Sequence, residues 1–238
     1  MSVARWVGLL GAAWLGTAGA EELATASPRS GMLEFKLGGY KPFIDREGAL
    51  SGARPYDKVF GDSPMLLGEL EYERQLFQRF GSLAAAISVG YAEKYGKSVT
   101  VGGDGTEASE TTALKFVPVR ALAVYRFDLL AQKWNVPLVP YVKAGLVAQP
   151  WWSEKGGSQE LVDGLQATGV KWGYQGTAGM SFLLDILEPR LARDFDTDLG
   201  VNHSYLFGEY TMAEVNDFGS KGFDFSSRHW MFGLALEY

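Results

Sequence analysis

The chain contains no cysteine, only two histidines, and no apolar run after residue 20 that is as long as a membrane helix. Without cysteine, disulfides, thiol catalysis, cysteine metal sites and lipid attachment to an N-terminal cysteine are excluded. Two histidines argue against a histidine-rich metal site, so we expect neither a metal nor a cofactor. A membrane helix needs about 20 apolar residues. If this chain crosses a bilayer, it must therefore do so with strands.

Charge narrows the possible partners. The formal net charge is -6, from 22 lysines and arginines against 28 aspartates and glutamates. A mildly acidic chain has no obvious attraction to the phosphates of a nucleic acid. We therefore expect no nucleic-acid partner.

The first twenty residues have the layout of an export signal. Arg5 is the only charge, an apolar stretch follows it, and Ala18-Gly19-Ala20 precedes two acids. This layout predicts a cleaved signal peptide over 1–20, because the A-x-A ending has no use in a retained anchor helix. We read 21–30, which is small, polar and broken by a proline, as a flexible leader. The remainder, 31–238, is expected to form one domain.

Eight later segments alternate between apolar and polar residues, which is the period of a strand with two different faces. In the first of them Leu33, Phe35 and Leu37 lie on one face, and Glu34 and Lys36 on the other. The predicted strands cover 32–40, 66–73, 82–91, 117–127, 137–147, 170–182, 203–212 and 227–238.

The spacers between these strands alternate in length. The segments 45–64, 93–114, 149–168 and 213–228 are long and polar, whereas 78–81 and 128–136 are short. This alternation is typical of an up-and-down antiparallel β-barrel with one rim facing the outside. The segment 185–200 breaks the rule, and Pro189 near its start predicts a short helix on the periplasmic rim.

Alternation alone does not say which face is inside, because a soluble carrier barrel has its apolar face inward. The residue types favour a transmembrane barrel. The polar face is rich in small residues, as a narrow lumen requires, and aromatic residues stand near the strand ends of the apolar face. The expected interface aromatics are Tyr91, Trp172, Tyr174 and Trp230 at one level, and Phe127 and Phe182 at the other.

The polar face would bring acids and bases together inside the barrel. Because an isolated ion in such a space costs several kcal/mol, a balanced set predicts a network of ion pairs rather than a pore. The predicted lumen network consists of Glu34, Lys36, Glu69, Glu71, Arg120, Arg126, Lys143, Lys171, Glu209 and Glu237.

The signal peptide, the eight alternating segments and the final "FGLALEY" together resemble the small outer-membrane β-barrels of Gram-negative bacteria, of the OmpA, OmpX and OmpW kind. The resemblance implies a monomer in the outer membrane, surrounded by outer-membrane lipid. It also implies that the barrel-assembly machinery reads the last strand through Phe232, Leu234, Leu236 and Tyr238. It says little about activity, since these barrels share a shape across several functions.

The two histidines are the candidates for a catalytic role. His203 adjoins Ser204, but neighbours on a strand point to opposite faces. His229 follows Asp224, Ser226 and Ser227 at the expected outer rim, in a spacing that is not a motif. We therefore expect no enzyme, and a structural or surface-interaction role. The alternatives are a narrow porin or conduit for small or apolar molecules, and a soluble secreted carrier.

Overall fold

The computed structural model describes residues 30–46, 50–99, 107–129, 134, 136–159, 161–162, 165–220 and 222–238. The expected signal peptide and all but the last residue of the expected leader lie outside these ranges. No helix in the described residues is long and apolar enough to cross a membrane.

The described chain forms a closed antiparallel ring of eight strands, as predicted. One of the eight is interrupted and consists of β4 and β5 in succession. The ring is built, in chain order, from β1 (Gly31–Tyr40), β2 (Met65–Gln78), β3 (Ser82–Val99), β4 (Glu107–Phe116) with β5 (Val119–Arg126), β6 (Leu138–Lys155), β10 (Thr168–Leu183), β11 (His203–Glu214) and β12 (Ser227–Glu237). The last strand pairs with the first, where Leu236 faces Leu33.

The register of the ring sets the width of the lumen. A path around the ring can be followed from each residue to its paired residue on the next strand. Such a path starts at His203 of β11 and returns to β11 at Ala213, so the two ends of the path are offset by ten residues. The path runs through Glu237, Met32, Glu73, Ala86, Leu122, Gly145 and Gln175. An eight-stranded barrel of this kind is just wide enough to be filled by its own side chains.

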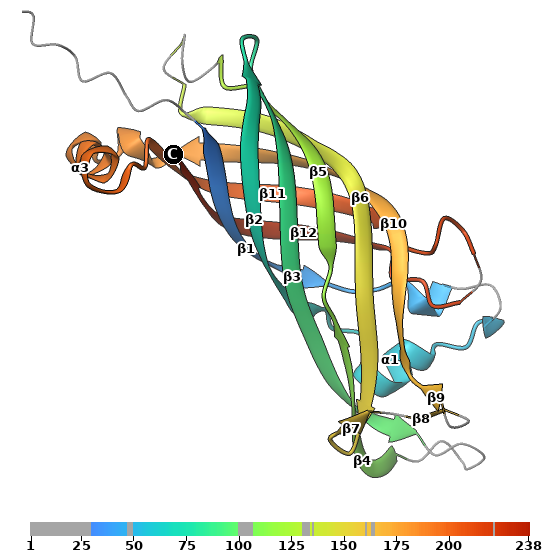
Figure 1. Cartoon of the computed structure of the whole chain (residues 1–238). Coiled ribbons are helices and arrows are strands. Elements are labelled where there is room, and N and C mark those ends of the chain that lie inside the picture. Colours follow the sequence, from blue (N-terminus) through green and yellow to red (C-terminus); the bar gives the residue numbers. More distant parts are fainter. Residues whose placement is uncertain are drawn as a thin grey trace, which may run out of the picture.

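The two rims of the barrel differ. The rim at which β1 begins and β12 ends, which we call the terminal rim, has the tight β2–β3 turn, a 3-10 helix η3 (Leu184–Ile186) and helix α3 (Pro189–Leu199). Figure 1 shows α3 beside the C-terminus, which confirms the helix expected within 185–200. The opposite rim, which we call the loop rim, carries η1 (Ile44–Arg46), α1 (Pro55–Phe60), β7 (Ser158–Gln159), β8 (Leu161–Val162) and β9 (Leu165–Gln166).

One expectation about the loop rim was wrong. The segments 93–114 and 149–168 were expected to be long loops, but β3 continues to Val99, β4 starts at Glu107 and β6 continues to Lys155. Polar residues replace apolar ones there because this part of the wall extends past the apolar belt. The wall on this side is therefore taller than on the others (Figure 1).

The apolar face of the wall points outward. Leu70 is 51% exposed and Ile87 is 58% exposed, while their neighbours Glu71 and Ser88 are buried inside. A closed ring with this orientation leaves no unpaired strand edge and presents an apolar belt, as hydrocarbon requires. The structure confirms the transmembrane barrel, and it rules out the soluble carrier, which needs the opposite orientation.

Candidate functional site in the barrel lumen

The middle of the lumen holds a cluster of charged side chains, which we call the ionic core. Each of its members is at most 5% exposed. They come from five strands: Glu34 and Lys36 from β1, Glu69, Glu71 and Glu73 from β2, Arg120 and Arg126 from β5, Lys143 from β6 and Glu209 from β11. The five acids and four bases nearly neutralise one another.

Lys143 stands at the centre of the ionic core. Its Nζ lies 2.5 Å from Glu71 Oε1 and 2.6 Å from Glu34 Oε2. It also lies 3.3 Å from Glu73 and 3.6 Å from Glu209. A single buried ammonium group therefore contacts four carboxylates. Charge-assisted hydrogen bonds of this length are among the strongest that a protein makes.

Lys36 plays the matching role on β1, across the lumen from β6. Its Nζ donates to Glu71 Oε2 at 2.7 Å and to Glu209 Oε1 at 2.9 Å. Both oxygens of Glu71 therefore accept from a lysine, one from each side. The hydroxyl of Tyr141 donates to the other oxygen of Glu209 at 3.0 Å.

The two arginines connect the ends of the ionic core. Arg126 pairs with Glu34, and its Nη2 donates to Glu73 Oε1 at 2.6 Å. Its guanidinium also lies 4.6 Å from the ring centre of Tyr141, a separation at which cation and ring attract. Arg120 pairs with Glu69. These contacts satisfy most of the hydrogen-bonding groups that burial removes from water.

Three carboxylates of the ionic core are arranged as they would be around a metal ion. One oxygen each from Glu34, Glu71 and Glu73 lies within 4.8 Å of the others. Carboxylates are ligands for hard cations such as calcium or magnesium. Here the ammonium group of Lys143 contacts all three. The protein itself thus supplies the positive charge that these acids need.

Sequence reasoning misplaced two members of the network and missed a third. Lys171 lies near the loop rim, where its Nζ donates to Asp217 at 2.6 Å. Glu237 lies near the terminal rim, where Gln75 and Tyr205 donate to it. Both have the inward parity but stand at the ends of the lumen. Glu73 shares the parity of Glu69 and Glu71, so its position could have been predicted.

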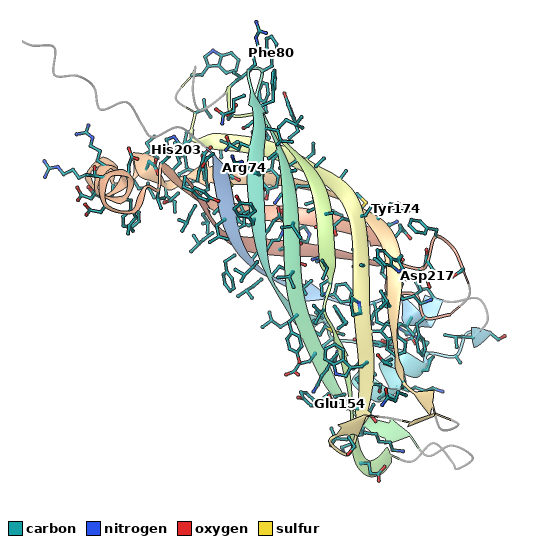
Figure 2. All side chains as sticks on the ribbon, in the orientation of Figure 1. Arg74, Phe80, Glu154, Tyr174, His203 and Asp217 are labelled. Carbon is teal, nitrogen blue, oxygen red and sulfur yellow. The ribbon has the colours of Figure 1, made fainter. Side chains whose placement is uncertain are left out.

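The pair near the loop rim has its own electrostatics. Partial burial acts to raise the pKa of Asp217, but the hydrogen bonds from Lys171 and the backbone of Trp172, together with the charge of Lys171, outweigh burial, and the pKa is lowered. Figure 2 shows Asp217 at this end of the barrel, far from His203 at the other end.

Above the ionic core, toward the loop rim, the lumen is apolar, which we had not expected. We call this cluster the aromatic plug. Its buried members are Tyr40, Ile44, Tyr56, Met65, Leu67, Ala92, Leu114, Phe116, Val147, Ala213, Val215, Phe225 and Met231. Ile44 and Tyr56 come from the segment between β1 and β2, and Phe225 comes from the segment between β11 and β12. The parity rule could not reveal segments that fold back into the lumen.

The aromatic plug is anchored to the wall by polar contacts. The hydroxyl of Tyr40 donates to the carbonyl of Phe225. The ring of Tyr40 packs 4.8 Å from that of Phe116. Helix α1 lies so close to β3 that a Cβ on Gly96 would overlap the carbonyl oxygen of Val59. The plug is thus a packed part of the fold.

Below the ionic core, a smaller apolar cluster fills the lumen toward the terminal rim. It consists of Met32, Val139, Tyr141, Tyr205, Phe207 and Ala235, with Leu183 packed against it. Gly179 makes room for the ring of Tyr141, which a Cβ at that position would overlap. The small residues expected on the inward face therefore make space for large ones opposite.

The structure pairs His229 with a serine inside the lumen and His203 with an aspartate at the terminal rim. His229 is 4% exposed and faces the lumen, where its Nδ1 lies 3.1 Å from Ser227 Oγ. Its Nε2 has no hydrogen-bond partner among the described residues, and Asp224 instead accepts from the backbone of Ser226. His203 Nδ1 lies 2.6 Å from Asp185 at the terminal rim. His229 therefore lies close to the loop rim, as expected, but its side chain is buried inside the lumen.

The outward face carries the other predicted groups. Of the expected interface aromatics, Tyr91, Phe127, Trp172, Tyr174 and Trp230 are exposed and Phe182 is half-buried. Phe232, Leu234 and Leu236 of β12 form an exposed row, which ends at the half-buried Tyr238. The backbone carbonyl of Tyr238 accepts hydrogen bonds from the amides of Ser30 and Gly31, which hold the chain end to β1.

No protein-family model and no curated protein matches the chain. Solved structures do. The attachment invasion locus protein Ail of Yersinia pestis, in complex with a heparin analogue, gives a TM-score of 0.45 at 13% identity, over 88% of this chain and 97% of that one. The outer membrane protein OprG from Pseudomonas aeruginosa gives 0.46 at 12% identity, over 88% and 96%. The outer membrane enzyme PagL gives 0.39 at 11% identity, over 85% and 97%.

All three TM-scores are below 0.5, and we base no argument on these similarities. The architecture of this chain is established by its own closed ring and outward apolar belt. On those grounds it is a transmembrane barrel of the outer-membrane type.

Proposed function

We propose that this outer-membrane barrel is a closed, non-conducting scaffold that stabilises the envelope and presents its loop rim to partners, without catalysing a reaction. The observation that carries the proposal is the filled lumen. At its centre, Lys143 has four carboxylate partners within 3.6 Å. Lys36 has three within the same distance and lies 3.9 Å from a fourth, Glu34. The aromatic plug closes the space above them.

The balance of charge supports a locked lumen over a selective pore. A pore lined by one sign of charge attracts the opposite ion. In the ionic core every described acid has a basic partner, and Lys143 contacts four acids at once. Charges that are already paired with one another attract a passing ion only weakly.

The loop rim offers a surface for recognition. Barrels of this type have short periplasmic turns and longer extracellular loops, so we place the terminal rim in the periplasm and the loop rim outside the cell. A cavity of about 430 Å³ lies there, lined by Lys41, Pro42, Phe43, Asp45, Arg46, Arg54, Asp57 and Asp62. The hydrogen bond from Lys41 lowers the pKa of Asp62, so this rim presents fixed charges of both signs.

The last strand supports two further parts of the proposal. Its exposed row of Phe232, Leu234 and Leu236 suits a strand that the barrel-assembly machinery reads from outside. Because β12 pairs with both β11 and β1, the ring closes within one chain. We therefore propose that the protein works as a monomer in outer-membrane lipid.

The test is conductance. Purified protein reconstituted into planar bilayers should remain silent under applied voltage, because the ionic core and the aromatic plug leave no continuous aqueous path. A general porin reconstituted by the same procedure serves as the positive control. Stepwise currents from the folded barrel would overturn the closed-lumen proposal in favour of a narrow porin.

One observation favours a second candidate, a conduit for small apolar molecules through the barrel wall. Pro118 separates β4 from β5 beside the aromatic plug, and it has no amide hydrogen to donate to the carbonyl of Gly90 opposite. Pro150, on the next strand, likewise cannot donate to Val117. Missing ladder bonds weaken a strand seam.

The conduit makes its own prediction. Cells with the wild-type barrel should take up a small apolar molecule faster than cells without it, and Pro118→Ala, which restores an amide donor, should slow that uptake. Pro137→Ala, at the terminal rim, is the matched control. Equal uptake in all strains would eliminate the conduit.

A further inference from the structure

The connection between β10 and β11 is far longer than the geometry requires. Adjacent antiparallel strands can be joined by a two-residue turn. Here η3 and α3 intervene, and they carry large apolar side chains into solvent. Ile186 is 52% exposed, Leu187 is 68% exposed and Leu199 is 69% exposed. Such exposure beside a rim is unusual unless something covers it.

Helix α3 has two unlike faces. Ala192, Phe195 and Leu199 recur at the spacing that places residues on one side of a helix. Arg190, Arg193, Asp194, Thr197 and Asp198 are exposed. Pro189 opens the helix, and Gly200 closes it in the left-handed conformation with φ of 68°, as at a typical helix end. These signals specify an amphipathic helix whose main packing partners among the described elements are η3 and β11.

Four contacts hold this excursion in place. Asp185 accepts from the backbone of Ser204 at 3.1 Å and lies 2.6 Å from His203 Nδ1. The amide of Leu183 donates to Pro137 at 2.8 Å, and the amide of Asn202 donates to Glu237 at 2.7 Å. The entry and the exit of the excursion are thus both tied to the rim, which fixes where α3 can lie.

The excursion starts where the lipid-facing belt ends. The outward residues Met180 and Phe182 of β10 precede η3 directly, and Leu206 of β11 follows α3 with 52% exposure. Figure 1 shows α3 standing to one side of the terminal rim, and Figure 2 places His203 next to it. The exposed apolar residues therefore continue the surface that contacts lipid.

We infer that η3 and α3 form a membrane-surface anchor, whose apolar side chains enter the periplasmic leaflet of the same membrane that the barrel spans. A helix with one apolar and one charged face lies in the plane of such an interface. Arg190 and Arg193, on the exposed face of α3, have side chains long enough to reach lipid phosphates at the interface. The acids of the polar face remain in water. The anchor would fix the tilt and depth of the barrel, a role separate from the closed lumen.

Site-specific labels can test the anchor because the chain has no cysteine of its own. Leu187→Cys and Leu199→Cys are labelled with a nitroxide, and the full-length protein is reconstituted in vesicles of phosphatidylethanolamine and phosphatidylglycerol. Collisions with oxygen report lipid, and collisions with a water-soluble nickel chelate report water. We expect the oxygen-to-chelate ratio at both positions to be several-fold higher than at a label on Thr197→Cys, on the polar face.

The outcomes separate the anchor from the barrel. A label on Leu70→Cys, in the middle of the belt, gives the lipid reference. The labels at positions 187 and 199 could collide with the chelate as often as the label at position 197 while the label at position 70 collides with oxygen. In that case the anchor proposal is wrong and the orientation of the barrel is unaffected. If the Leu70 label itself meets water, the barrel orientation fails. Spin-spin broadening at Leu199 that vanishes on dilution with unlabelled protein would assign the face to a second copy and overturn the anchor.

Discussion

Replacing Lys143 with methionine should lower the free energy of unfolding by about 3–5 kcal/mol, the usual loss when one partner of a buried ion pair is removed. Methionine keeps most of the side-chain volume, so packing changes little. What is lost is the ammonium group that separates Glu34, Glu71 and Glu73. Denaturant unfolding of the vesicle-bound protein, followed by the heat-dependent shift in gel mobility, measures the effect.

Two controls make this result specific to the ionic core. Lys171→Met removes a lysine near the loop rim, where the single partner Asp217 is partly exposed, and should cost at most about 1 kcal/mol. Adding Glu71→Gln to Lys143→Met should recover part of the loss, since it removes one uncompensated charge. If the two lysine variants were equally stable, the ionic core would not be a structural centre.

Placing an arginine at Ile87 should destabilise the barrel by about 2–4 kcal/mol, the cost of that charge at the middle of a lipid-facing wall. Ile87 is 58% exposed on the outward face of β3. In a soluble protein the same change at so exposed a position would have almost no effect. Unfolding in lipid vesicles therefore reads out which face of the strand meets hydrocarbon.

Position along the barrel provides the control for this second effect. Val170→Arg lies on the same outward face but near the loop rim, beyond Trp172 and Tyr174, and is 48% exposed. The cost should fall to about 0–1 kcal/mol there, because an arginine near the interface reaches water. Similar costs at positions 87 and 170 would contradict a belt with a defined depth.

Sequence alone was enough for the wall of the barrel but not for the contents of its lumen. Period-two alternation located all eight strands because one residue of slip would turn every side chain to the wrong face. Pro189 and Gly200 marked α3 by local conformational preference. The outer parts of β3 and β6 and the whole of β4 were missed because a strand that leaves the belt keeps its pairing while it loses its apolar residues.

The contents of the lumen were harder to predict, because the parity of a residue tells which face of the strand it lies on but not its position along the barrel axis. Lys171 and Glu237 have the inward parity of Lys143, but the stagger of the strands places them at opposite ends of the interior. The aromatic plug was missed for another reason. Tyr56 and Phe225 reach the lumen from connecting segments, and a loop that folds inward leaves no periodic signal.

The ionic core has a consequence for how the ring is completed. Glu209 stands on the seventh strand of the ring, whereas Lys36 stands on the first, and the two meet at 2.9 Å only across the seam that the final strand seals. In an open sheet this ion pair would be absent, and Lys36 would keep only its partners on β1 and the adjacent β2. The ion pair therefore favours the closed ring over an open one.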